Sequence, residues 1–256
     1  MSRLFIFDLD GTSLIPGREP YNRLPDFFSE FLDEITSRGW QWSINSTWDI
    51  RGQWRMVLVS RVKSRPKYLM GEMGLRLARV KGEELEFIQP YTGNMEERVR
   101  KAVEENIFPL IREISSRFNP SRMHFYGHLF EFTVNSQEKE KFIEFVEGLR
   151  KDGVNVIINR EKGTFVAYPS FLHKGAPVRE IIRREKIPPS RIVVAGDEVI
   201  DLPMMEPACT LHPICPSNAP EKVKEHVRSL GGVVSDKPYA EGVVEAFHKL
   251  LKAGKI

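Results

Sequence analysis

Two carboxylates follow a short apolar run near the beginning of the sequence, and this arrangement limits the possible folds more than any other feature. The run Leu4–Phe7 is too short for a helix and contains β-branched and aromatic residues, which predicts a buried strand of a parallel sheet. Asp8 and Asp10 come directly after it, followed by Gly11 and Thr12. Ligands of open α/β sheets bind just outside the carboxyl ends of the strands. Two acids and a glycine in that place suit a divalent cation and a phosphate group, although they also suit a polar turn in which an aspartate caps a helix.

Later segments continue an alternation of strands and helices. Apolar spacing and turn residues predict, in the first part of the chain, a helix over 24–38, a strand over 40–44, a helix over 50–60 and a short strand over 66–70. After residue 174 they predict a helix over 177–186, strands over 192–195 and near 209–211, a helix from 221, a short strand at 233–234 and a closing helix over 242–251. Such an alternation is typical of a doubly wound parallel sheet, so we expect an α/β, Rossmann-like core.

The pattern changes between residues 83 and 172. Here we expect a long helix over 95–118 that Pro109 would interrupt, a second helix over 137–150, and hairpins over 123–134 and 154–167. This αββαββ order predicts a separate α+β domain inserted into the core. The core is then formed by residues 1–82 and 173–256, and the insert by residues 83–172.

A second pair of acids lies after another predicted strand. Asp197 and Asp201 are four positions apart and would face the same side of a helical turn. Two acids at a strand end repel each other unless a cation or a lysine offsets their charge. A helix cap with an acid in the first turn is the alternative interpretation.

Two further positions are candidates for binding an anion. Lys174 lies between the insert and the resumed core, where its ammonium group could neutralise a carboxylate or a phosphate, although a solvated loop lysine would look the same. Ser46 and Thr47 end the second predicted strand. Their hydroxyls could hold phosphate oxygens or cap the next helix.

The composition limits the classes of partner. The sequence has 38 Lys and Arg against 35 Asp and Glu, a formal net charge of +3, and the basic residues are dispersed, so we expect no nucleic-acid partner. No apolar run approaches the roughly 20 residues of a membrane span, and a strand beginning at residue 4 leaves no room for a signal peptide. Cys209 and Cys215 have no zinc-type ligand spacing around them, so free thiols are expected. A cytoplasmic protein, either a monomer or a small homo-oligomer, is the resulting expectation.

The order of these motifs resembles the haloacid dehalogenase (HAD) superfamily of phosphotransferases: Asp-x-Asp-Gly-Thr, a strand-end Ser/Thr, a Lys, and Gly-Asp-x-x-x-Asp. The resemblance covers nearly the whole chain. The segments that are similar to the Cof-type and sucrose-phosphatase-like branch are Lys174-Gly-Ala, Val193–Met205, Ser217-Asn218-Ala219 and Glu241-Gly242-Val243. The position of the insertion and its αββαββ order are similar to that branch's C2 cap of type B, which is expected to close over the strand ends.

The resemblance implies a role for each motif residue. Asp8 would be the nucleophile that forms an aspartyl-phosphate, and Asp10 the general acid and then the general base. Ser46 or Thr47 would bind the phosphoryl group, and Lys174 would steady the phosphate and the nucleophile. Mg²⁺ would be bound by Asp8, the backbone carbonyl of Asp10 and Asp197, with Asp201 supporting directly or through water.

The sequence departs from the family pattern at two places. Relatives commonly continue the second motif with Gly-Arg, where this chain has Thr47-Trp48 or Trp48-Asp49, and they often have Asn where this chain has Ile200. These changes bear on substrate placement more than on the reaction. Trp48, with the other tryptophans of the chain, is expected to pack in the core or at its edges.

Together these features predict a Mg²⁺-dependent phosphatase that acts on a small phosphorylated metabolite, with a sugar phosphate as the expected substrate. The chemistry suits the residues, because a carboxylate is a competent covalent catalyst and Mg²⁺ prefers oxygen ligands. A phosphomutase of the same superfamily, and a non-catalytic protein that binds a phosphorylated ligand, are the alternatives.

Overall fold

The computed structural model describes residues 3–15, 23–149 and 152–256. The sequence also predicts a loop over 16–20, which lies outside the described residues. Contacts divide the chain into two units, which we call the core unit (residues 1–92 and 173–256) and the inserted unit (residues 93–172). Among the described residues, no helix combines the length and the apolar character that a membrane crossing requires.

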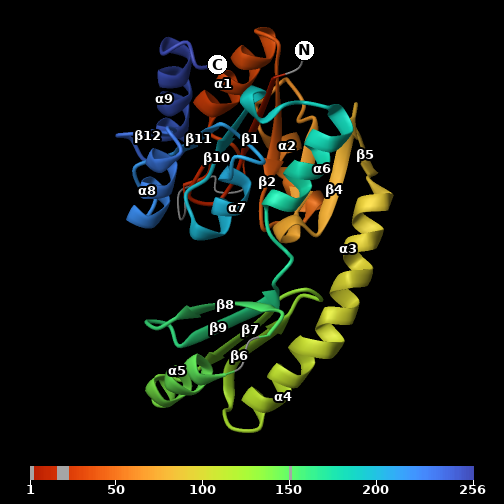
Figure 1. Ribbon diagram of the computed structural model, residues 1–256, viewed down its shortest axis with the longest axis vertical. Helices are drawn as coiled ribbons and strands as arrows, with labels where there is room; N and C mark the ends of the chain where they lie inside the picture. Colours follow the sequence, from red (N-terminus) through yellow and green to blue (C-terminus); the bar gives the residue numbers. More distant parts are fainter. Residues whose placement is uncertain (1–2, 16–22, 150–151) are drawn as a thin grey trace. The chain divides into compact units, whose positions relative to one another are not determined.

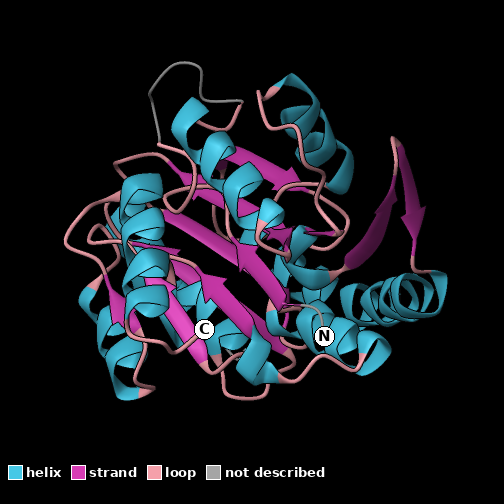
Figure 2. Ribbon diagram, turned by 90° about the horizontal axis from the view of Figure 1, so that it is seen from above, coloured by secondary structure: helices cyan, strands magenta, loops and turns pink. Residues whose placement is uncertain are grey.

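The core unit is built on one eight-stranded sheet (Figures 1 and 2). Its strand order is β12-β11-β10-β1-β2-β3-β4-β5, and the first six strands of this order are parallel. The parallel strands are β1 (Arg3–Phe7), β2 (Trp40–Asn45), β3 (Tyr68–Gly71), β10 (Ile192–Ala195), β11 (His212–Cys215) and β12 (Val233–Val234). The expected parallel α/β core is confirmed.

Helices cover both faces of this sheet, which explains why β1 is apolar at every position after Arg3. Phe5 and Phe7 belong to one apolar cluster and Leu4 and Ile6 to another, and all four are fully buried. The first cluster includes residues of α1 (Asp26–Ser37), α2 (Ile50–Val59) and α9 (Tyr239–Lys252). The second includes residues of α6 (Gly175–Glu185), α7 (Leu202–Met205) and α8 (Glu221–Ser229).

An antiparallel hairpin extends the sheet where the sequence interpretation placed no strands. β4 (Arg76–Lys81) pairs with β3, and β5 (Glu84–Phe87) pairs with β4 across the turn at Gly82. Because these strands belong to the core sheet, the contacts place the first boundary between the units after residue 92, whereas the sequence interpretation placed it after residue 82.

The inserted unit contains a four-stranded antiparallel sheet with the order β6-β7-β9-β8. Its strands are β6 (Pro120–Phe125), β7 (Phe130–Val134), β8 (Val154–Asn159) and β9 (Thr164–Pro169), and α5 (Lys139–Gly148) lies between the two hairpins in the chain. The helix expected over 95–118 is divided into α3 (Gln89–Ala102), a π-helical segment (Val103–Ile107) and α4 (Phe108–Ser115). Pro109 lies in the first turn of α4, directly after the π-helical segment.

Candidate active site

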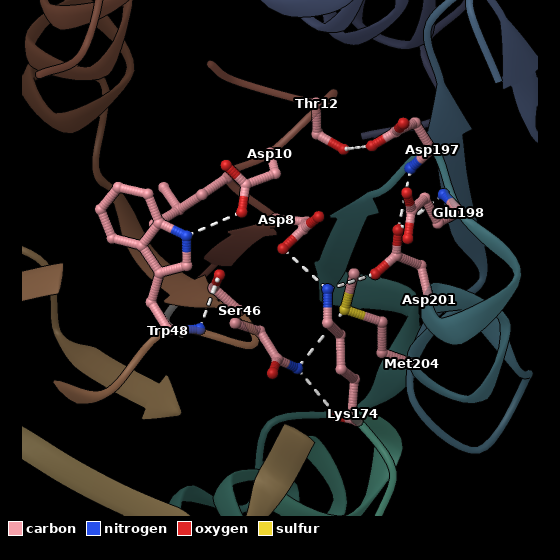
Figure 3. A network of polar contacts seen from close by, with 12 residues as sticks. Asp8, Asp10, Thr12, Ser46, Trp48, Lys174, Asp197, Glu198, Asp201 and Met204 are labelled. Atoms are coloured by element: carbon pink, nitrogen blue, oxygen red, sulfur yellow. Dashed lines mark hydrogen bonds and ion pairs between the residues drawn. The ribbon is translucent and has the colours of Figure 1, made fainter. Parts of the chain in front are cut away.

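The candidate site lies where three neighbouring strands of the core sheet end. β1 lies between β10 and β2, and the strand register places Phe7 opposite both Ala195 and Ile44. The backbone N–H of Asp8 extends this pairing by donating to the Ala195 carbonyl at 3.0 Å. The residues that follow the three strands are thereby brought together at one edge of the sheet (Figure 3).

Lys174 bridges two buried carboxylates. Its Nζ lies 2.7 Å from Asp8 Oδ1 and 2.6 Å from Asp201 Oδ1, and all three side chains are buried. The next residue, Gly175, packs so closely against α7 that a Cβ there would lie 2.1 Å from the Pro203 carbonyl oxygen. Any side chain at this position would push the start of α6, and with it the lysine, away from the acids.

Burial and charge act in opposite directions on the groups of this bridge. Burial by itself would lower the pKa of Lys174, but the carboxylates of Asp201 and Asp8 outweigh it and hold that pKa above its usual value, so the side chain is an ammonium ion. Burial raises the pKa of Asp8 well above its usual value, against the opposing effect of Lys174, and Asp201 raises it further. One cation between two anions leaves negative charge in excess.

Asp201 also fixes the loop that follows β10. Its Oδ2 accepts hydrogen bonds of 2.9 Å from the backbone N–H groups of Asp197 and Glu198. A Cβ on Gly196 would lie 2.6 Å from the Asp201 Cβ, so only glycine fits there. The sequence predicted that Asp197 and Asp201 share one side of a helical turn. In the structure Asp201 instead ends a 3-10 turn (Val199–Asp201), and its carboxylate turns back to accept the hydrogen bond from the backbone N–H of Asp197.

Asp197 is held by Thr12 from the loop after β1. Thr12 Oγ1 donates to Asp197 Oδ1 at 2.6 Å, and both side chains are buried. Burial raises the pKa of Asp197 to about 7, the Thr12 hydrogen bond opposes this rise, and the neighbouring Asp201 adds to it. Gly11 has a φ of +76°, and a Cβ there would lie 2.2 Å from Asp197 Oδ2, so the close approach of the two loops requires a glycine.

Asn218 supports the same loop and was left without a role by the sequence reasoning. Its Nδ2 donates to the Gly11 carbonyl at 2.9 Å, and its Oδ1 accepts from the backbone N–H of Tyr239 at 2.7 Å. Thr12 was also left without a role. Both residues lie in segments that carried the family resemblance, which was the available signal, but neither bond is readable from spacing.

The carboxylate of Asp10 makes a different contact from that of Asp8. Its Oδ2 accepts a 2.7 Å hydrogen bond from Trp48 Nε1, and both residues are partly buried (Figure 3). The Asp10 carboxylate is not one of the three carboxylates that could hold a metal ion, which belong to Asp8, Asp197 and Asp201. The sequence analysis expected the backbone carbonyl of Asp10, and not its carboxylate, to bind Mg²⁺. Trp48 does pack against the apolar core, as expected, but its bond to Asp10 was not anticipated.

The two hydroxyls of the second motif differ in burial. Ser46 is fully buried and Thr47 is exposed. Ser46 Oγ accepts from the backbone N–H of Trp48 at 3.3 Å. The preceding residue, Asn45, donates from Nδ2 to the Lys174 carbonyl at 2.8 Å, which ties the end of β2 to the start of α6.

Three buried carboxylates are arranged so that they could hold a metal ion. One oxygen from each of Asp8, Asp197 and Asp201 lies within 4.8 Å of the other two. A set of oxygen donors suits Mg²⁺ and similar hard cations. Burial is the main cause of the raised pKa values of Asp8 and Asp197, Asp201 adds to it, and the opposing effect of Lys174 does not cancel it. A divalent cation would supply the missing positive charge, so the residues fit such an ion.

Comparison with known proteins identifies relatives of the sequence. The family model of the haloacid dehalogenase-like hydrolases matches residues 91–247, more than half of the 256-residue chain. The matched segment contains Lys174, Asp197 and Asp201, and it begins after Asp8 and Asp10. No curated protein matches the sequence.

Solved structures with the same fold cover nearly the whole chain. The sucrose-phosphatase of Synechocystis, solved in complex with sucrose and phosphate, is similar with a TM-score of 0.66 at 16% identity, over 96% of this chain and 97% of that chain. A Thermoplasma acidophilum protein is similar with a TM-score of 0.68 at 17% identity, over 98% and 99%. A HAD-superfamily phosphatase from Bacteroides thetaiotaomicron is similar with a TM-score of 0.62 at 15% identity, over 100% and 96%.

Proposed function

The chain belongs to the haloacid dehalogenase-like hydrolases, and from this premise we propose that it is a Mg²⁺-dependent phosphatase that hydrolyses a small phosphomonoester through an aspartyl-phosphate on Asp8. The observation that carries the proposal is the 2.7 Å contact between Asp8 and the buried ammonium group of Lys174, at the carboxyl end of the central strand. A carboxylate in this place is a competent nucleophile for phosphoryl transfer.

The reaction has two steps in which the atoms balance. A carboxylate oxygen of Asp8 attacks phosphorus, the ester P–O bond breaks with its electron pair moving to the leaving oxygen, and Asp10 donates a proton to that oxygen. Water then attacks the aspartyl-phosphate and loses a proton to Asp10, and the P–O bond to Asp8 breaks. Inorganic phosphate leaves, and both acids return to their starting forms.

The remaining site residues bind the phosphoryl group or the metal ion. Lys174 stays protonated because its pKa is raised, so its ammonium group can face both Asp8 and the phosphoryl oxygens throughout turnover. Ser46 is our choice for the phosphate-binding hydroxyl over Thr47, because Ser46 is buried at the strand end. HAD hydrolases use a divalent metal. We assign Mg²⁺, bound by Asp8, the Asp10 carbonyl and Asp197 with support from Asp201; when bound, it would supply positive charge beside the transferring phosphoryl group.

We propose a sugar phosphate as the substrate class. The support is the similarity to a sucrose-phosphatase that was solved with sucrose and phosphate, over nearly the full length of both chains. A small phosphorylated metabolite suits a site built on strand ends, where ligands of open α/β sheets bind.

Phosphate release from a panel of sugar phosphates and para-nitrophenyl phosphate tests the proposal. Wild type should release phosphate with Mg²⁺ and lose this activity with EDTA, and Asp8→Asn and Asp10→Asn should each lose it while remaining folded by circular dichroism. Conversion of a sugar phosphate to its isomer without phosphate release would indicate a mutase instead. Turnover that survives in Asp8→Asn would overturn the aspartyl-phosphate mechanism.

A further inference from the structure

Trp48 donates a side-chain hydrogen bond to the carboxylate that the proposed mechanism uses as acid and base. The indole Nε1 lies 2.7 Å from Asp10 Oδ2, although the two residues are 38 positions apart. We infer that Trp48 is a positioning residue, which fixes the orientation of the Asp10 carboxylate so that its other oxygen, Oδ1, exchanges protons with the leaving group and with water. This inference rests on the proposed function.

Both backbone polar groups of Trp48 make hydrogen bonds. Its N–H donates to Ser46 Oγ at 3.3 Å, and its carbonyl accepts from Gln53 Nε2 at 2.9 Å and from the Glu72 N–H at 3.2 Å. A Cβ on Gly71 would lie 2.8 Å from the Trp48 carbonyl oxygen, so β3 approaches this residue as closely as its backbone allows. These contacts fix the backbone of Trp48 relative to the ends of β2 and β3.

The ring is held as well as the backbone. Trp48 is partly buried and packs against the apolar cluster that β1 forms with α1, α2 and α9. A tryptophan side chain has two rotatable bonds, so packing one face fixes the direction of its N–H at small entropic cost. Figure 3 shows the indole N–H directed at the Asp10 carboxylate.

The chemistry of the donor determines which carboxylate oxygen is engaged. An indole N–H donates and cannot accept, so Asp10 Oδ2 must be the acceptor. The carbonyl-type oxygen of a carboxyl group is the better acceptor, which favours placing the transferable proton on Oδ1. Loss of the N–H would remove a hydrogen bond that orients the carboxyl group, and misorientation of an acid by a small amount costs substantial rate.

Replacement of Trp48 by phenylalanine removes the N–H and keeps an aromatic ring. The second-order constant kcat/KM covers the steps up to departure of the leaving group, so it isolates the acid role of Asp10 from later hydrolysis. The p-nitrophenolate ion departs without a proton, whereas a sugar alkoxide needs one. Trp48→Phe should lower kcat/KM about tenfold for the sugar phosphate that wild type hydrolyses fastest, and less than twofold for para-nitrophenyl phosphate. Asp10→Asn, which does not complete turnover, should show the same selectivity more strongly in the single-turnover release of the leaving group.

Trp54→Phe is the matched control, because Trp54 packs into the same apolar cluster from α2. It should leave the ratio of the two kcat/KM values unchanged. An equal fall for both substrates in Trp48→Phe, or no fall, would overturn the inference, because a merely structural residue gives no leaving-group dependence.

A second measurement, by NMR, detects the hydrogen bond between Trp48 and Asp10 without any enzymatic turnover. The four tryptophan indole N–H groups give separate ¹H–¹⁵N signals, and the Trp48 signal is identified by its loss in Trp48→Phe. Asp10→Ala should shift that signal more than the other three; an unmoved signal would overturn the inference. If wild type hydrolyses neither substrate, the proposed function fails together with the role assigned to this bond, whereas an active wild type with an unmoved signal contradicts the Trp48 inference alone.

Discussion

Thr12 Oγ1 donates a 2.6 Å hydrogen bond to Asp197 Oδ1 across 185 positions of the sequence. The bond joins the loop after β1 to the loop after β10, which precede and follow the inserted unit in the chain. Hydrogen bonding to an ionised carboxylate favours the charged form, so Thr12 opposes the effect of burial on the pKa of Asp197. The same bond orients one of the three acids that could hold a metal ion.

We predict that Thr12→Val weakens metal binding about tenfold, because residues that orient a ligand typically change metal affinity by about 10- to 100-fold. Valine keeps the branched shape and removes the donor. The measurement is Mg²⁺ binding by titration calorimetry, with Thr12→Ser as the control that restores the hydroxyl. Equal Mg²⁺ affinities for Thr12→Val and wild type would contradict the prediction.

We predict that Gly11→Ala removes phosphatase activity, whereas Gly39→Ala only lowers stability. Both glycines have positive φ, +76° and +84°, so alanine at either position costs about 1 kcal/mol of backbone strain. At Gly39 no atom of the described residues, apart from the adjacent backbone, lies within 4 Å of the added Cβ, but at Gly11 Asp197 Oδ2 lies 2.2 Å from it and must move. Urea unfolding and phosphate release measure the two effects, and full activity in folded Gly11→Ala would contradict the prediction.

The sequence was sufficient to predict the core because β1 is fully buried on both faces and is followed directly by polar residues. A run such as Leu4–Phe7 fits only a strand covered on both sides, and the residue after it must then lie at the edge of the sheet where other strands also end. Asp8, Asp197 and Ser46 each follow a predicted strand, the family resemblance assigned them to one site, and the structure brings them to one edge of the sheet.

Other features depended on information that a local pattern does not contain. The sequence analysis expected a strand near residues 209–211, but β11 lies at His212–Cys215. Proline lacks an N–H and usually argues against a strand, yet Pro213 is accommodated in the sheet. The sequence analysis placed no strand at β4, which contains charged residues. It belongs to the sheet through its pairing with β3, which the local sequence does not reveal. The bond from Trp48 to Asp10 is a contact between side chains of distant residues, for which no spacing rule exists.

We predict that Lys174→Met, besides losing activity, is destabilised by about 3 kcal/mol at pH 8, because removing one partner of a buried ion pair leaves uncompensated charge. Methionine has a similar length and no charge. Because burial already raises the pKa of Asp8, protonation at lower pH should remove part of the cost, so the deficit should shrink at pH 5. Urea unfolding in EDTA at both pH values measures it. A deficit that is equal at pH 5 and pH 8 would contradict this explanation.

We predict that the metal-free protein loses stability between pH 5 and pH 7 and that Asp197 is one source of this loss. Its pKa is about 7 in the folded state against an ordinary value of 3.8, so between these values the folded state holds a proton that the unfolded state has released. The free energy of unfolding therefore falls as pH rises, by at most about 1.4 kcal/mol per pH unit for one group, and the contribution of this group is fully lost above its folded pKa.

Asp197→Asn isolates this contribution, because asparagine is neutral at every pH and can still accept the Thr12 hydrogen bond. In urea unfolding with EDTA, wild type should lose about 2 kcal/mol more than Asp197→Asn between pH 5 and pH 7. Added Mg²⁺ should restore wild-type stability at pH 7 and do so less at pH 5, where it must displace a proton. Parallel pH profiles for the two proteins would mean that Asp197 ionises normally and that burial does not control this carboxylate.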